Sequence, residues 1–369
     1  MLIGIDGSRA FLNNRTGIEE YSYQVIKNMK SVLEGHQVLL YVRKNQTVDF
    51  PIPENWKVKK INLFRFWTQI GLAWEMFLRP VDVLFVPAHT VPWIHPEKTV
   101  VTVHGLEYEI MPQAYSMWER FYMRRSIINS CRWAKNIISV SENTKNDLMR
   151  LYEVPERKIQ VIYDGYDRMT VLKSDAGRKV PEGKYLLFIG RLEERKNIRG
   201  IVNAFEILKE RYGIPHKLVL AGRFGYGAEK IREEIRNSNC VHDVILPGFI
   251  SEEEKWKLLE SADIFLFPTF YEGFGIPVLE AQSAGVPVVA GNNSSIPEVV
   301  SSKRGSIGSA DQKSALLVDV NNAEEIAEAA YGLISDENLR KNIIQGGLEN
   351  VKRFSWKKCA SQVADILAE

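Results

Sequence analysis

Two glutamates, Glu272 and Glu280, stand eight residues apart in the segment 268–280 (PTFYEGFGIPVLE). The segment follows the strand-like run DIFLFP, and Pro277 is well placed as the first residue of a helix. The free N–H groups and the positive end of that helix would bind an anion. We expect Glu280 to accept hydrogen bonds from ribose hydroxyls and Glu272 to meet a polyhydroxylated ligand. A solvated turn is the alternative, and the strand–loop–helix context favours the site.

A second segment, 190–197 (GRLEERKN), stands directly after the strand-like run KYLLFIG. Asn197 is a candidate N-cap for the helix that IRGIVNAFEILKE would form. Arg191 and Lys196 flank this turn, where a guanidinium and an ammonium could neutralise a diphosphate. The alternative is a solvated run of charges. The position of segment 190–197 at the carboxyl end of a strand favours the anion site.

Two features of the first half could also contact a ligand. Thr16 and Glu19 fit a capping box, with Thr16 as the N-cap and Glu19 reaching back. Gly17, between them, lacks a Cβ and would let phosphate oxygens approach the start of that helix. His104 ends the run TVVTVH, where it could contact a ligand or serve as a structural histidine. The sequence does not decide between the structural and the ligand-binding interpretation of these two residues.

The elements that must position these residues alternate along the chain. Strand-like runs lie at 2–6, 37–42, 81–87, 99–104, 136–141 and 158–165, then at KYLLFIG, KLVLAG, DVILPG, DIFLFP and PVVAG, with helical patterns between them. This alternation predicts an α/β fold of two Rossmann-like, doubly wound parallel sheets facing a cleft. Ligands bind such sheets beyond the carboxyl ends of the strands. The expected parts are a first domain over 1–165, a linker over 166–183, a second domain over 184–353, and a helix at about 354–369 that packs back on the first.

The composition agrees with two globular domains. A chain of 369 residues with 45% hydrophobic and 25% charged residues is neither disordered nor a coiled coil. The sequence lacks the run of about 18–20 apolar residues that a spanning helix needs, and MLIGIDGSRA lacks a signal-peptide core. Cys131, Cys240 and Cys359 are odd in number and far apart, which predicts reduced thiols in a cytosolic protein and no zinc site.

The charge is unevenly distributed. Residues 1–180 carry 25 Lys and Arg against 19 Asp and Glu, and the remainder carries 23 against 27. A basic first half favours an anionic partner. Two stretches, 63–80 and 113–137, interleave aromatic and basic residues, as helices on an anionic membrane do. Burial of these aromatics in the core, with the arginines solvated, is the alternative, and the sequence leaves both open.

Together these segments resemble the retaining nucleotide-sugar glycosyltransferases of family 4, which have the GT-B fold. The resemblance covers nearly the whole chain, from GIDGSRAFLNNRTGIEEYSYQVI to the closing RFSW, and rests most on the Glu-x7-Glu block together with GRL…KN. The chain is most similar to bacterial surface-polysaccharide mannosyltransferases. The resemblance implies transfer of a hexose, first of all mannose from GDP-mannose, to a hydroxyl of a glycan or lipid-linked acceptor. It implies a cytoplasmic enzyme, at the inner face of the cell membrane if the membrane contact holds, with no metal, other cofactor or nucleic-acid partner.

The resemblance also implies roles for the candidate residues. Arg191 and Lys196 would hold the donor diphosphate, Glu280 the ribose, and Glu272 the donor sugar. The catalytic set is then His104, Arg191, Lys196 and Glu272, and the donor-binding set is Gly17, Arg191, Lys196, Glu272, Phe274, Gly275, Ile276, Pro277 and Glu280. The chain departs from the family at Gly105, where Asp is frequent, and at Asp164, where Asn is frequent.

Two other functions remain open at this level. An NAD-dependent oxidoreductase would need a dinucleotide fingerprint, and AGRFGYG lacks its spacing. A catalytically silent sugar-nucleotide-binding protein is the other alternative. For a transferase, no residue stands out as the carboxylate nucleophile of a double displacement. The sequence therefore favours a front-face reaction in which cations stabilise the leaving diphosphate.

Overall fold

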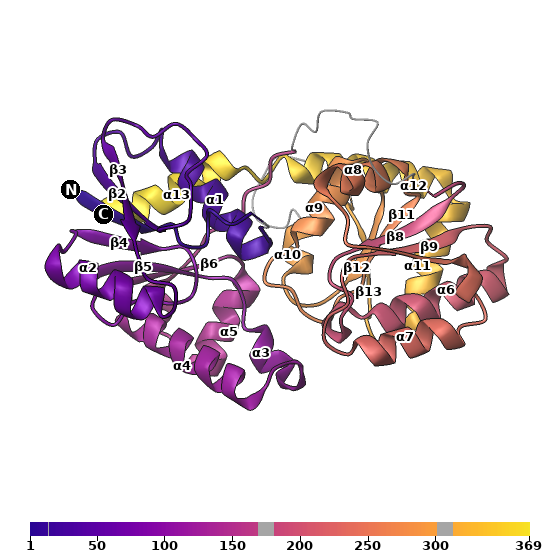
Figure 1. Ribbon diagram of the computed structural model, residues 1–369. Coiled ribbons are helices and arrows are strands. Elements are labelled where there is room, and N and C mark those ends of the chain that lie inside the picture. Colours follow the sequence, from indigo (N-terminus) through magenta and orange to yellow (C-terminus); the bar gives the residue numbers. More distant parts are fainter. Residues whose placement is uncertain (14, 169–180, 301–312) are drawn as a thin grey trace. The chain divides into compact units, whose positions relative to one another are not determined.

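The computed structural model describes residues 1–13, 15–168, 181–300 and 313–369. The chain forms two compact units (Figure 1). Unit 1 comprises Met1–Asp167 and Phe354–Glu369, and unit 2 comprises Arg168–Arg353. The C-terminal segment thus belongs to the first unit although it follows the second in sequence. Most of the predicted linker, 169–180, lies outside the described residues.

Unit 1 is built on a parallel sheet which, in its described part, has seven strands in the order β3-β2-β1-β4-β5-β6-β7. Strand β1 pairs with β2 on one side and with β4 on the other. The strand order therefore reverses between β1 and β4, the place where open α/β sheets bind ligands. The strands are β1 (Leu2–Asp6), β2 (Gln37–Arg43), β3 (Trp56–Ile61), β4 (Val83–Val86), β5 (Lys98–Val103), β6 (Asn136–Ser139) and β7 (Ile159–Val161).

Helices cover both faces of this sheet, so its central strands β1, β4 and β5 are almost wholly buried. Figure 1 shows α1 and α13 on one side and α2, α4 and α5 on the other. Helix α13 packs on α1, with the rings of Trp356 and Tyr21 6.1 Å apart. The helical elements are α1 (Gly17–Met29), the π-helix η1 (Trp67–Leu72), α2 (Ala73–Leu78), α3 (Glu107–Ile110), η2 (Pro112–Ala114), α4 (Met117–Trp133), α5 (Glu142–Tyr152), η3 (Glu156–Lys158) and α13 (Trp356–Ala368).

Unit 2 repeats this plan with a six-stranded parallel sheet, within the described ranges, in the order β10-β9-β8-β11-β12-β13. Its order reverses between β8 and β11, which pair directly. The strands are β8 (Tyr185–Ile189), β9 (Lys217–Ala221), β10 (Val244–Gly248), β11 (Ile264–Phe267), β12 (Val288–Gly291) and β13 (Leu316–Val318). The helices are η4 (Glu194–Lys196), α6 (Ile198–Tyr212), α7 (Ala228–Asn237), η5 (Val241–Asp243), α8 (Glu252–Ser261), α9 (Ile276–Ser283), α10 (Ile296–Val300), α11 (Ala323–Ser335) and α12 (Glu337–Val351).

The predicted class, two α/β units with parallel sheets, is confirmed, and two strands were not predicted. Both of them, β3 and β13, lie at an edge of their sheet. The capping box of Thr16 and Glu19 is confirmed, with the Thr16 N–H 3.2 Å from the Glu19 carboxylate. The three cysteines are free. Among the described residues, every helix is too short or too polar to cross a membrane.

Candidate active site

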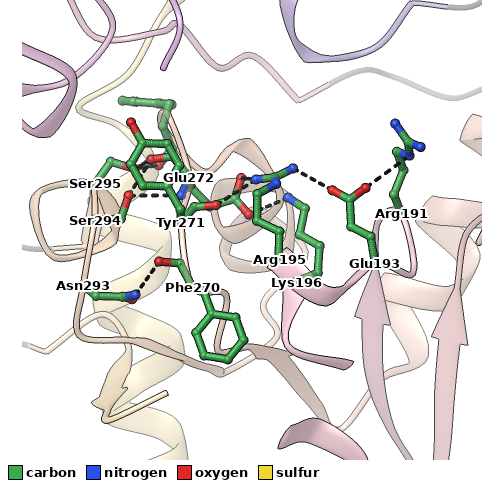
Figure 2. Close-up of polar contacts among 11 residues, drawn as sticks. Arg191, Glu193, Arg195, Lys196, Phe270, Tyr271, Glu272, Asn293, Ser294 and Ser295 are labelled. Atoms are coloured by element: carbon green, nitrogen blue, oxygen red, sulfur yellow. Dashed lines mark hydrogen bonds and ion pairs between the residues drawn. The ribbon is translucent and has the colours of Figure 1, made fainter. Parts of the chain in front are cut away.

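Three loops at the carboxyl edge of the unit 2 sheet are joined to one another (Figure 2). They follow β8, β11 and β12, so they stand at and beside the reversal of strand order. The Phe270 N–H donates to the Arg195 carbonyl at 2.9 Å, and the Asn293 amide donates to the Phe270 carbonyl at 2.8 Å. The segments 190–197 and 268–280, which are far apart in sequence, therefore form one site.

Asn197 fixes the start of α6 at this site. As predicted, it is the N-cap, and its side-chain oxygen accepts from the Gly200 N–H at 3.2 Å. Its side-chain amide donates to the carbonyls of Pro268 at 3.0 Å and Val320 at 2.7 Å. Asn197 adopts the left-handed conformation with φ 55°, which Asn tolerates better than most residues. One buried side chain thus links the loops after β8, β11 and β13.

Lys196 and Glu272 form a buried ion pair in the centre of the site. The other Glu272 carboxylate oxygen lies 3.5 Å from the Arg195 guanidinium. Burial alone would raise the pKa of Glu272, but Lys196 and Arg195 outweigh burial and hold it below its usual range. Burial lowers the pKa of Lys196, against the opposing charge of Glu272. Glu272 is therefore a carboxylate at neutral pH, with both of its oxygens facing cationic side chains.

A chain of charges connects this pair with solvent. Arg195 donates to the Tyr271 carbonyl at 2.7 Å and to Glu193 at 3.0 Å. The Arg191 guanidinium is 3.5 Å from Glu193 and its side chain is 68% exposed. With Lys196 and Glu272, the cluster holds one more cation than anion and presents Arg191 outward. Sequence reasoning missed Glu193 and Arg195, although both lie in the charge run that it identified.

Two serines after β12 hold the loop that carries Glu272. The Ser294 hydroxyl donates to the Glu272 carbonyl at 2.6 Å and accepts from the Glu272 N–H at 3.0 Å. The Ser295 hydroxyl lies 2.7 Å from the Phe274 carbonyl and 3.0 Å from the Glu272 carbonyl. Sequence reasoning missed both serines. The available signal was polar residues just after PVVAG, because β12 is the neighbour of β11.

Helix α9 begins at Ile276, so Pro277 is its second residue, and the prediction that Pro277 is the first was wrong by one. The N-cap is Gly275 with φ 117°, a conformation that a Cβ would strain. Glu280 lies on this helix, half-buried, and accepts from the Lys255 ammonium at 2.6 Å. The structure thus brings Lys196 and Glu272 into contact and pairs Glu280 with a cation of α8.

The candidates of the first half, Gly17 and His104, lie in unit 1. A Cβ added at Gly17 would meet nothing within 4 Å among the described residues, so there is open space beside this first residue of α1. The His104 Nε2 lies 2.8 Å from the Pro87 carbonyl, to which a neutral ring with Nε2–H donates. The His104 ring stands edge-on to Tyr21 at 4.6 Å and to His89 at 5.3 Å. Burial first, and the nearby His89 second, lower the pKa of His104 to about 3. His104 is therefore a neutral ring at the carboxyl end of β5.

Comparison with known families decides the identity. The model of Glycosyltransferase Family 4 matches residues 15–169, and the model of glycosyl transferases group 1 matches residues 172–349. Together they match nearly the whole chain. This chain belongs to the glycosyltransferases of group 1 and family 4.

Curated relatives of this glycosyltransferase include O-antigen enzymes. O-antigen chain mannosyltransferase B of Escherichia coli is 26% identical over 371 residues, covering 94% of each chain. O-antigen chain mannosyltransferase RfbU of Salmonella typhimurium is 25% identical over 241 residues, covering 65% of this chain and 64% of the relative. The chain is thus similar to mannosyltransferases of polysaccharide synthesis, as the sequence predicted.

Solved structures show that the glycosyltransferase has the GT-B fold. Sucrose-phosphate synthase from Thermosynechococcus elongatus superposes with a TM-score of 0.73 at 18% identity, covering 99% of this chain and 97% of that one. HepE from Anabaena, solved in complex with UDP-glucose, superposes with a TM-score of 0.70 at 15% identity, covering 100% and 99%. Family membership also removes the oxidoreductase alternative.

Proposed function

We propose that this glycosyltransferase moves a hexose, first of all mannose from GDP-mannose, to a hydroxyl of a glycan or lipid-linked acceptor. The transfer retains the anomeric configuration, needs no metal and takes place in the cytoplasm. The observation that carries the proposal is the cluster of Arg191, Glu193, Arg195, Lys196 and Glu272 at the reversal of the unit 2 sheet. Its net positive charge suits a diphosphate.

In this proposal the protein's main contribution is stabilisation of the leaving group. Arg191 is exposed, and its guanidinium would turn from Glu193 onto a phosphate, whereas Lys196 is held in place by Glu272. The start of α9 adds N–H groups and a positive dipole end near the same loop. Fixed cations of this kind stabilise charge that develops in the transition state, where one lost donor costs roughly 2.7–4 kcal/mol.

The same geometry supports the front-face reaction. Both carboxylate oxygens of Glu272 face cations, one at Lys196 and one at Arg195, so its negative charge is already compensated. A carboxylate in that setting is a poor nucleophile. We propose that the acceptor oxygen attacks from the face that the diphosphate leaves, and that a diphosphate oxygen takes the acceptor proton. The glycosidic bond to the acceptor forms as the bond to the diphosphate breaks.

The choice of donor and acceptor rests on the relatives. Those named above are mannosyltransferases of O-antigen chains, and such chains are glycans. HepE, whose structure contains UDP-glucose, supports a nucleotide sugar as donor. Mannose and a saccharide acceptor are accordingly the first pair to test.

The deciding experiment measures slow hydrolysis of a panel of nucleotide sugars without acceptor. We expect GDP-mannose to be hydrolysed fastest and the rate to survive EDTA. NMR of the first product formed with a saccharide acceptor reports the anomeric configuration, which we expect to be retained. Tight binding of donor without turnover of any sugar would favour the silent binding protein instead.

A further inference from the structure

Large aromatic side chains on unit 1 remain uncovered by the fold. Three lie around η1 and α2, namely Phe66, Trp74 and Phe77, and three lie on the first turns of α4, namely Trp118, Phe121 and Tyr122. Their exposed fractions run from 58% to 81%. We call these six residues the outer aromatic surface. Burial of these aromatics in the core, one of the two alternatives from the sequence, is therefore wrong for these six.

Both groups belong to one helical layer. The inner sides of η1, α2 and α4 share a hydrophobic core with the sheet. This core includes Trp67 of η1, Met76 of α2 and Ile127 of α4. The loop after β4 bridges them, because the Val91 carbonyl accepts from Gln69 of η1 at 3.1 Å and the Val91 N–H donates to Ser130 of α4 at 2.9 Å. Figure 1 shows α2 and α4 on the same side of the sheet.

Two exposed aromatics of α4 share one face of the helix with an exposed arginine. Trp118, Phe121 and Arg125 are spaced by three and four residues, so they share one face of the helix. Ile127, with Cys131 one turn later, forms the face that is buried against the core. Helices α2 and α4 thus each have one apolar side that packs against the core and exposed aromatic side chains that the core does not cover.

The surroundings of the outer aromatic surface are positively charged. Five exposed basic residues on the same segments have no ion pair within the part of the chain that the structure describes: Arg65, Arg79, Arg125, Arg132 and Lys135. The carboxylate of Glu75 is 3.4 Å from Lys59, and Glu119 accepts from the Ser116 hydroxyl in a capping box. The cations therefore outnumber the anions there.

We propose that the outer aromatic surface binds an anionic lipid bilayer. Trp, Tyr and Phe beside arginines are the residue types that lie at the headgroup level, where the rings enter the acyl boundary and the cations meet lipid phosphates. A second copy of the chain fits less well, because a twofold interface would set this positive surface against itself. The proposal that this surface binds a bilayer rests on the geometry of unit 1 alone. The use of the surface to reach a lipid-linked acceptor rests on the proposed function.

Sedimentation with lipid vesicles tests the surface. The full chain should bind vesicles of phosphatidylcholine with phosphatidylglycerol, should not bind pure phosphatidylcholine, and should be released by salt. The double variant Trp118→Ala with Phe121→Ala should bind at least about tenfold more weakly. Its matched control is Phe249→Ala in unit 2, an aromatic side chain that is 55% exposed. Arg125→Ala should weaken binding about fivefold, and Arg236→Ala on α7 should not.

Three results would overturn the proposal. One is a wild-type protein that stays in the supernatant with anionic vesicles at low salt. Another is equal binding by the double variant and its Phe249→Ala control. The third is a wild-type dimer in solution, seen by analytical ultracentrifugation, that the double variant loses, since the occupant is then a second copy. Donor hydrolysis without vesicles should be the same in all these variants. A failure of hydrolysis in the wild type would refute the proposed function and leave the vesicle result unaffected.

Discussion

At the scale of single residues, Lys196 and Arg191 should respond differently to removal. Arg191 is 68% exposed, so Arg191→Ala should lower kcat/KM by roughly two to three powers of ten without loss of stability. Lys196→Ala should lower kcat/KM similarly and also cost about 2–3 kcal/mol of unfolding free energy, because it removes one of the two cations that face the buried Glu272 in the described structure. Steady-state kinetics and urea unfolding measure the two effects.

A matched surface variant and a double variant complete this test. Arg199→Ala removes a half-exposed cation of α6 that pairs with Glu234 at 2.8 Å, and it should change neither quantity. Lys196→Ala combined with Glu272→Ala should recover stability but not activity, since no buried charge is then left uncompensated. Wild-type kcat/KM in Arg191→Ala and Lys196→Ala would remove both residues from the active site.

Replacement of Glu280 and of Glu272 should affect different steps, ligand binding in one case and sugar transfer in the other. If Glu280 binds the ribose, Glu280→Ala should weaken binding of a nucleoside diphosphate about tenfold and leave inorganic pyrophosphate unaffected. Glu272→Ala should spare nucleoside diphosphate binding and damage sugar transfer. Lys255→Ala is the control, because it removes the partner that lies 2.6 Å from Glu280 and leaves the carboxylate in place. Calorimetric titrations that show equal losses for both ligands in Glu280→Ala would contradict the ribose role.

Asp164 should make stability depend on pH. Its side chain is buried, and one oxygen has no hydrogen-bond partner among the described residues. Burial raises the pKa of Asp164 from 3.8 to about 8. The folded protein keeps a proton that the unfolded chain releases above about pH 4, so this stabilisation is complete below pH 4 and is lost as the pH rises through 8.

Asp164→Asn replaces the titrating group with a neutral one and should remove this fall in stability. We expect the variant to gain on the order of a few kcal/mol over the wild type at pH 8 and to match it near pH 4. Urea unfolding between pH 4 and pH 9 gives both curves. Parallel curves for the two proteins would show that Asp164 does not titrate in this range.

At the scale of elements, the sequence predicted the central strands and two of the edge strands, β7 and β10, and missed the other two, β3 and β13. Strands such as LIGID and DIFLFP are buried on both faces and appear as continuous apolar runs between turn residues. Strand β3 (WKVKKI) is exposed at Lys57 and Lys60 and resembles a polar segment, as edge strands do. Strand β13 has three residues, too few for a periodic pattern. Edge position is set by sheet order, which local sequence does not encode.

For the candidate site, too, the sequence indicated some residues and missed others. Lys196, Glu272 and the N-cap Asn197 could be placed because each follows a recognisable strand. Glu193, Arg195 and Ser294 act through contacts across β8, β11 and β12, and such contacts depend on which strands are neighbours. From the sequence alone, a charge run or a pair of serines has many possible contact partners. The fold selects one of them.

At the scale of the whole molecule, the chain leaves unit 2 after Arg353 and completes unit 1 with α13. The buried side of this helix includes Val363, Ile366 and Leu367. Each such side chain contributes roughly 1.5–3 kcal/mol, so their sum approaches the 5–15 kcal/mol that holds a typical domain folded.

Damage to α13 should therefore unfold unit 1, although the helix follows unit 2 in sequence. Ile366→Ala should cost about 2–4 kcal/mol and should speed hydrogen exchange in β1, β4 and β5 while β8 and β11 stay protected. Asp365→Ala, on the exposed side of the same turn, is the matched control and should leave every strand as in the wild type. Mass spectrometry of exchange resolves the two sheets. Faster exchange in β8 and β11, with β1 unchanged, would mean that the helix stabilises unit 2 instead.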